Sequence, residues 1–177
     1  AHLDALGPVR CKQLQLVSGD AASYIANVVY ERCLNAVLCL DPFHIVKWAT
    51  EALDEVRRDV WNQLRRDGKK EQAQSLKRSR WALWKSPESL TDKQRCKLSE
   101  IEKDNQPLFR AYLLKEQMRE VFRYSGGYAC VQLQGFVAMA TRSGLAPFIK
   151  LASSIRAHQC GIDAALVHGL SNARVES

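Results

Sequence analysis

The sequence lacks the features that mark several broad classes of protein. Its 177 residues contain no run of 18 or more apolar residues, so no stretch is long enough to cross a membrane as a helix. The first residues show no basic-then-apolar pattern, so a secretory signal is not indicated. The six cysteines form no C-x-x-C pair, and no cysteine or histidine pair has zinc-ligand spacing. We therefore expect free thiols in a reducing compartment and no zinc site.

Strand-like sequence is also scarce, and it is confined to the first 44 residues. Residues 12–18 predict a short strand, residues 21–32 a helix opened by Asp20, and residues 36–40 a continuous apolar strand buried on both faces. Strand, helix and strand in this order predict a βαβ crossover with parallel strands. Because two strands do not form a stable sheet alone, either further strands complete it or the chain is a fragment.

Helical sequence is abundant in the rest of the chain. Apolar residues at helical spacing predict a long amphipathic helix from Ile45 to about Arg66. Shorter helices are predicted at about 71–85, 91–104 with Thr91 as N-cap, 105–124, 128–142 and 147–167. The predicted fold class is therefore mostly α with a small α/β part, in a chain of ordinary globular composition with 46% hydrophobic and 25% charged residues.

The positive charge is concentrated in the middle of the chain. The formal net charge is +7, and residues 57–123 contain 18 basic and 10 acidic side chains, so the whole excess lies there. A solvated helical surface explains such a run in many proteins. The alternative is a surface that contacts the phosphate backbone of a nucleic acid.

Carboxylates at the ends of the predicted elements are the candidate chemical groups. Asp20 and Asp41 each follow a predicted strand, His44 follows Asp41 by one turn, and Glu176 lies near the end of the sequence. The carboxyl ends of parallel strands meet at one edge of a sheet, where open α/β sheets bind ligands. Carboxylates at that edge could hold Mg²⁺, and two such ions could activate an attacking oxygen and stabilise a leaving one.

Each of these residues also has a plain structural interpretation. Asp20 could be an N-cap, Asp41 a turn residue before proline, His44 a residue at a helix start, and Glu176 a first-turn glutamate favoured by the helix dipole. Trp81 and Trp84 lie among basic residues and could stack on nucleic-acid bases. Tryptophans three positions apart are more often core anchors, and we predict that role for them.

Four segments carry a resemblance to a known family. They read CLDPFHIVKWATEALDEVRRDVWNQLRR, KRSRWALWKSPESLTDKQRCKL, FRAYLLKEQMREVF and GLSNARVES. Together they resemble bacterial insertion-sequence transposases of the ISL3 family, over nearly the whole chain. The D-P-F-H-x-V-K-W and S-N-x-x-V-E stretches are the most specific parts. The resemblance implies a partial RNase H-like fold interrupted by a helical insertion, with DNA cleavage and strand transfer by a D-D-E triad and Mg²⁺ or Mn²⁺.

The resemblance also assigns roles to individual residues. It implies that Asp20 and Glu176 are triad carboxylates that ligate the metal, and that Asp41 and His44 form a D-x-x-H element supporting the site. A second mapping makes Asp41 the second triad aspartate. The basic residues expected to contact DNA are Arg57, Arg58, Arg65, Arg66, Arg78 and Arg80.

The family pattern predicts a three-part chain. Residues 1–44 would be the partial catalytic core, 45–168 the helical insertion, and 169–177 the return to the core. Because the pattern places the first triad aspartate upstream of residue 1, we expect a fragment truncated at both ends that performs no strand transfer alone. Recovery of joining by residues 1–177 would refute this expectation.

The resemblance further implies partners and a location. Transposon ends and target DNA are the expected partners in transposition, a form of DNA recombination. A homo-oligomer is possible for the full-length protein, no membrane is involved, and the bacterial cytoplasm and its nucleoid are the expected location. Two alternatives stay open: a non-catalytic helical module that binds DNA or protein, and an unstable product without function.

Overall fold

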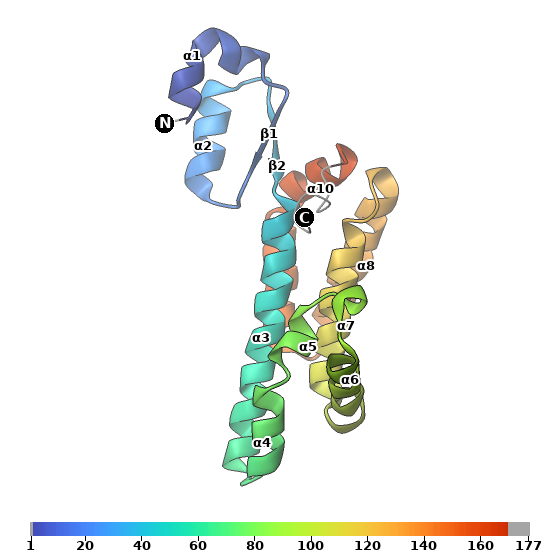
Figure 1. Ribbon diagram of the computed structural model, residues 1–177. Helices are drawn as coiled ribbons and strands as arrows, with labels where there is room; N and C mark the ends of the chain where they lie inside the picture. The colour runs from blue at the N-terminus through green and yellow to red at the C-terminus, as the bar shows by residue number, and fades with distance from the viewer. Residues whose placement is uncertain (1, 170–177) are drawn as a thin grey trace. The chain divides into compact units, whose positions relative to one another are not determined.

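The computed structural model describes residues 2–169 (Figure 1). It is mostly helical with a small parallel sheet of two strands, which confirms the coarse fold class. The described elements are α1 (His2–Gln13), β1 (Leu16–Gly19), α2 (Ser23–Arg32), β2 (Val37–Leu40), α3 (Pro42–Arg66), α4 (Lys70–Lys77), α5 (Arg80–Trp84), the 3₁₀ turn η1 (Pro87–Ser89), α6 (Asp92–Asp104), α7 (Gln106–Val121), α8 (Gly126–Arg142), α9 (Ala146–Ala157) and α10 (Gln159–Val167).

The chain divides into two compact units. The first contains the described residues within Ala1–Ile45, Glu120–Gln134 and Ser154–Ser177, and the second contains Val46–Arg119 and Gly135–Ser153. The sheet belongs to the first unit, and the basic middle of the sequence falls largely in the second. The predicted boundaries at residues 44 and 168 rest on family resemblance and stay a prediction.

The two strands of the first unit run parallel, as predicted. Their register pairs Leu16 with Val37 and Gly19 with Leu40, and α2 connects them. A small core lies between this sheet and α1 and α2; it consists of Cys11, Val29 and Cys33, with Leu14, Val17, Ile25, Ala36 and Leu38 packed against it. Apolar side chains on both strands thus have a helix to pack against, which is what a crossover connection provides.

Helix α10 packs on β2 and brings a late part of the chain to the sheet. The contact is close at Gly161, where a Cβ would lie 3.0 Å from Leu40 Cγ and 3.6 Å from the carbonyl oxygen of Leu38. A side chain at position 161 would therefore separate the helix from the strand. The continuous apolar run at residues 36–40 is consistent with this second packed face.

In the second unit the N-terminus of α6 confirms a sequence prediction. Thr91 is the N-cap, its Oγ1 accepts a hydrogen bond from the backbone N–H of Gln94, and Gln94 Oε1 accepts one from the N–H of Thr91 at 3.0 Å. This reciprocal capping box satisfies two backbone donors that a helix start otherwise leaves unpaired. Helix α5 packs against α6 just upstream of this cap.

Two predicted helices are each interrupted in the structure. The helix expected at 71–85 consists of α4 and α5, separated at Ser79, whose buried hydroxyl donates to the carbonyl of Leu76 at 2.7 Å. The helix expected at 147–167 consists of α9 and α10, separated at His158, whose Nδ1 lies 2.9 Å from the carbonyl oxygen of Ser154. In both places a side chain bonds to the preceding turn and competes with continued helix.

The first strand begins later than predicted. We predicted a strand from residue 12. Gly7 does break the helical path, with φ of 72°, but the chain resumes helix and continues to Gln13. The strand therefore begins only at Leu16.

Candidate functional site

The two candidate aspartates lie at the same edge of the parallel sheet. Gly19 and Leu40 are the last paired residues of β1 and β2, and Asp20 and Asp41 follow them directly. The backbone N–H of Asp41 donates to the carbonyl of Gly19 at 2.8 Å, which continues the strand pairing by one step. The register thus places both residues side by side at the carboxyl edge, where the sequence predicted them.

Asp20 is held by a local hydrogen bond and is not a helix cap. Its Oδ1 accepts from the backbone N–H of Ala22 at 3.1 Å. The N-cap of α2 is Ala22 itself, and no side chain caps this helix start. The half-buried carboxylate of Asp20 is therefore fixed by a turn ahead of the helix, which leaves the N-cap interpretation without support.

Asp41 combines a structural role with a contact to His44. Its Oδ1 accepts from the N–H of Phe43 at 3.0 Å in the first turn of α3. Its Oδ2 lies 3.4 Å from Nδ1 of His44. This nitrogen is buried, and its contact with Asp41 does not have the geometry of a hydrogen bond. Phe43 packs edge-on against the imidazole, with ring centroids 5.7 Å apart. The D-x-x-H element thus forms one cluster at the start of α3.

The donor chemistry of this edge suits a hard cation, but the described ligands are few. Asp20 and Asp41 offer carboxylate oxygens, which Mg²⁺ prefers over nitrogen or sulfur. Within residues 2–169 no group of three or more His, Cys, Asp or Glu side chains could hold a metal ion. Glu176, the other predicted ligand, lies outside the described residues. A complete site therefore needs at least one oxygen donor beyond the two aspartates.

Five of the six predicted DNA-contacting arginines are exposed, and Arg57 is the exception. Its Nε lies 2.8 Å from Oδ1 of Asp54 and its side chain is only 14% exposed. The guanidinium of Arg65 lies over the Trp61 ring at 4.8 Å, which leaves its other face to solvent. Arg57 is thus a structural ion-pair partner on α3, and the prediction that it reaches DNA lacks the required exposure.

The tryptophan prediction is wrong for Trp81. Its side chain is 59% exposed on α5, while the neighbouring Ala82 and Leu83 are buried. Trp84 is partly buried and meets Trp81 edge-on, with ring centroids 6.2 Å apart. The prediction failed because Ala82 and Leu83 form the buried side of α5, which leaves Trp81 on its exposed side.

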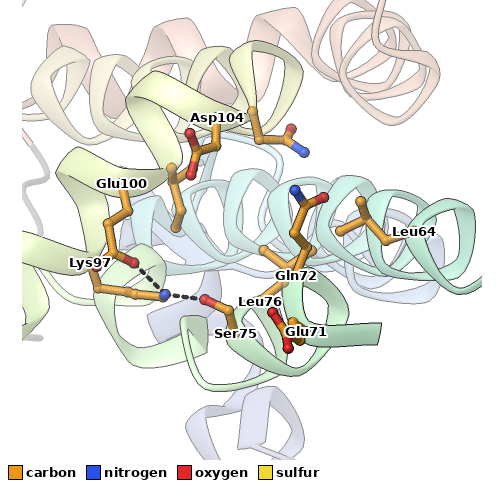
Figure 2. A pocket seen from close by; sticks show the side chains of 10 residues that line it. Leu64, Glu71, Gln72, Ser75, Leu76, Lys97, Glu100 and Asp104 are labelled. Carbon is orange, nitrogen blue, oxygen red and sulfur yellow. Dashed lines mark hydrogen bonds and ion pairs between the residues drawn. The ribbon is translucent and has the colours of Figure 1, made fainter. Parts of the chain in front are cut away.

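A cavity in the second unit is lined by both acidic and basic side chains. The cavity has a volume of about 270 Å³, and Figure 2 shows its polar lining from α4 and α6. Lys97 bonds to Ser75 and Glu100, and Glu71 and Asp104 add two further carboxylates. Its net acidic lining is unsuited to a phosphate group, so it is no candidate for a DNA backbone contact.

A buried cluster of charged side chains on α7 was missed by the sequence prediction. Lys115 is fully buried, pairs with Glu116, and donates to the carbonyl of Lys85 at 3.3 Å. Burial lowers the pKa of Lys115, and the neighbouring Glu116 opposes this shift. Burial also raises the pKa of Tyr112 to about 12, with Glu116 adding to the effect. The sequence contained a signal for this cluster. Lys115 lies at helical spacing among the apolar, buried positions 108, 111, 118 and 122, which places it on the buried side of the helix.

Comparison with known proteins identifies the class of this chain. A family model of the ISL3 type, described as a transposase, matches residues 1–177. The chain therefore belongs to the ISL3 family of transposases, as the sequence resemblance predicted. Among the described residues, no helix combines the length and apolarity that a membrane crossing requires.

Two curated relatives show how much of the family protein this chain represents. The transposase for insertion sequence element IS1557 of Mycobacterium tuberculosis is 46% identical over 193 residues, covering 98% of this chain and 44% of the relative. The transposase for insertion sequence element IS1001 of Bordetella parapertussis is 28% identical over 178 residues, covering 99% and 43%. The chain thus spans less than half the length of these relatives. No solved structure matches it.

Proposed function

We propose that this chain contributes part of the metal-dependent centre with which a transposase cleaves and joins the DNA of an insertion sequence. The supporting observation is the placement of Asp20 and Asp41 side by side at the carboxyl edge of parallel strands. In this proposal the β1–α2–β2 segment is a portion of an RNase H-like fold, and residues 45–168, from α3 to α10, form the helical insertion.

The residues of the edge would divide the chemistry between them. Asp20 and Glu176 would ligate Mg²⁺ or Mn²⁺, which when bound activates the attacking oxygen and stabilises the leaving one. The hydrogen bond from Ala22 to Oδ1 holds the Asp20 carboxylate in one orientation before any ligand arrives. Asp41 and His44 would support the edge, with the Asp41 carboxylate 3.4 Å from Nδ1 of the imidazole and bonded to the backbone of Phe43.

The basic helices would contribute contacts to the DNA backbone. Arg58, Arg65 and Arg66 are exposed on α3, and Arg78 and Arg80 are exposed around the start of α5. Arginine side chains that neutralise phosphates release condensed counterions, so binding weakens as salt rises. Transposon ends and target DNA are the proposed partners, with action at the bacterial nucleoid in the cytoplasm and a homo-oligomer of the full-length protein.

The DNA-contact part is tested by the salt dependence of binding. A fluorescent DNA duplex is titrated with residues 1–177, and anisotropy gives the dissociation constant at several salt concentrations. We expect log K to fall linearly with log salt, by a slope of about −0.9 for each phosphate contact. Arg66→Ala should flatten the slope by about one contact. Lys150→Ala, which removes an exposed lysine of α9 outside the basic region, is the charge-matched control. A flat salt response would overturn the proposal.

The metal part is tested by Mn²⁺ binding followed by electron paramagnetic resonance. Asp20→Asn keeps the shape and the hydrogen bond from Ala22 but removes the charge. We expect it to weaken Mn²⁺ binding at least tenfold, as loss of a carboxylate ligand does. Asp59→Asn, an exposed carboxylate of α3, should leave Mn²⁺ binding unchanged. Equal binding by both variants would instead favour a non-catalytic helical module.

A further inference from the structure

An exposed indole stands in the most uniformly basic stretch of the chain. The segment KRSRWALWK, residues 77–85, contains four cations and no carboxylate. Trp81 lies in it with 59% of its side chain exposed, and Lys77, Arg78 and Arg80 are exposed beside it. A partner with both a flat apolar face and negative charge would fit an exposed tryptophan amid cations, because covering the indole removes apolar surface from water.

The neighbouring Trp84 holds this surface in a defined shape. The guanidinium carbon of Arg80 lies 3.9 Å from the centroid of the Trp84 ring, and Trp84 meets Trp81 edge-on. The Nε1 atom of Trp84 is buried and has no hydrogen-bond partner among the described residues. Trp84 is thus the fixed inner ring, while Trp81 is the outer ring that a partner can reach.

The segment is also anchored from behind. The buried Lys115 of α7 donates to the carbonyl of Lys85, the residue directly after α5. Ala82 and Leu83 are buried on the inner side of α5, which packs against α6. Because the C-terminal end and the inner face of α5 are held, the exposed ring needs little ordering when it binds, and preorganisation of this kind favours affinity.

We propose that Trp81 is a stacking site for an unpaired DNA base, with Lys77, Arg78 and Arg80 contacting the adjoining phosphates. This inference rests on the proposed function, since it assigns a subsite to the same DNA partner. Stacking on aromatic side chains is tolerant of base identity and contributes strongly to binding of single strands, where base faces are accessible. In a duplex the neighbouring base pairs cover those faces, so Trp81 recognises single-stranded DNA or a base displaced from the helix.

The experiment compares two oligonucleotides that have the same charge. One is a 12-nucleotide oligothymidylate, and the other has the same phosphodeoxyribose backbone with abasic sites in place of the bases. Residues 1–177 are titrated with each, and binding is followed by anisotropy and by quenching of tryptophan fluorescence. We expect the oligothymidylate to bind about 5- to 100-fold more tightly, because stacking needs the base and phosphate contacts do not.

Variants assign the difference to Trp81. Trp81→Ala should weaken oligothymidylate binding to the level of the abasic strand and leave abasic binding unchanged, whereas Trp81→Phe should retain part of the preference. Tyr30→Ala removes an aromatic side chain that is 62% exposed on α2 and should change neither affinity. Circular dichroism of each variant verifies that the helices remain folded.

The outcomes separate this inference from the proposed function. Equal binding of the two strands by the unaltered chain, with steep salt dependence, would overturn stacking and leave the phosphate contacts in place. Absence of binding to either strand would overturn both. A preference for bases that persists in Trp81→Ala would also refute the assignment, because another aromatic side chain would then be the platform.

Discussion

Replacement of the buried Lys115 should destabilise the second unit strongly. The ammonium group has no solvent exposure, pairs with Glu116, donates to the carbonyl of Lys85 and lies 4.9 Å from the centroid of the Tyr112 ring. Lys115→Ala removes all three contacts together with the aliphatic stem. Lys115→Met removes the charge but keeps most of the buried apolar volume.

The magnitude follows from what each variant leaves behind. Loss of one partner of a buried ion pair costs about 3–5 kcal/mol, because the other charge remains in a poorly solvated site. Here Glu116 keeps Arg119, whose Nη1 lies 2.9 Å from Oε2, so we expect the lower end of the range, about 3 kcal/mol, for Lys115→Met, which keeps most of the buried volume. Lys115→Ala loses the same ion pair and also leaves a cavity in place of the aliphatic stem, so it should cost about 5 kcal/mol. A loss of about 3 kcal/mol corresponds to a fall in Tm of roughly 6–12 °C in a chain of this size.

Urea unfolding followed by circular dichroism measures these free energies. Lys150→Ala, an exposed lysine on α9, should change the free energy of unfolding by less than about 0.5 kcal/mol. Adding Glu116→Gln to Lys115→Met should restore part of the lost stability, because the uncompensated carboxylate is then removed. If Lys115→Met is as stable as the unaltered chain, Arg119 alone balances Glu116 and the reasoning is refuted.

Three further outcomes follow from the described contacts. The raised pKa of Tyr112 means that, between about pH 10 and 12, the folded chain keeps a proton that the unfolded chain loses. The free energy of unfolding should therefore fall as pH rises through this range. Tyr112→Phe should remove this part of the fall, measured by urea unfolding. Thr91→Ala removes the side-chain cap of α6 and should cost about 1 kcal/mol, measured by thermal unfolding. Gly161→Ala places a Cβ 3.0 Å from Leu40 and should cost about 1–3 kcal/mol, whereas Gly135→Ala, with open space around it, should gain about 0.5–1 kcal/mol.

The sequence predicted the elements whose determinants are local. The apolar run before Asp41, the proline after it and the Thr91–Gln94 pair each specify a strand end, a helix start or a cap within a few residues. The interruptions at Ser79 and His158 escaped prediction, because a serine or histidine inside a helical pattern is compatible with continued helix. Only the bond that each side chain makes to the preceding turn shows that the helix ends there.

The candidate site was predictable in position and only partly in detail. Two aspartates directly after two apolar strands predict a shared edge, and the register of β1 and β2 places them there. The turn that holds Asp20 and the ion pair between Arg57 and Asp54 depend on side-chain geometry, which no residue pattern specifies. Exposure of Trp81 depends on which face α5 presents to α6, and that is a property of packing across the unit.

The packing of α10 on β2 has a consequence for how the chain reaches its native state. Roughly 120 residues of mostly helical chain separate the two elements. The entropy cost of closing a loop grows only slowly with its length, but a contact between distant residues forms late in folding. At a synthesis rate of about 5–20 residues per second, β2 leaves the ribosome about 6–24 s before the helix that packs on it. During that interval the apolar side chains of Val37–Leu40 that α10 later covers are accessible to other chains. Slow translation through the helical region would therefore lengthen the period in which this protein is prone to aggregate.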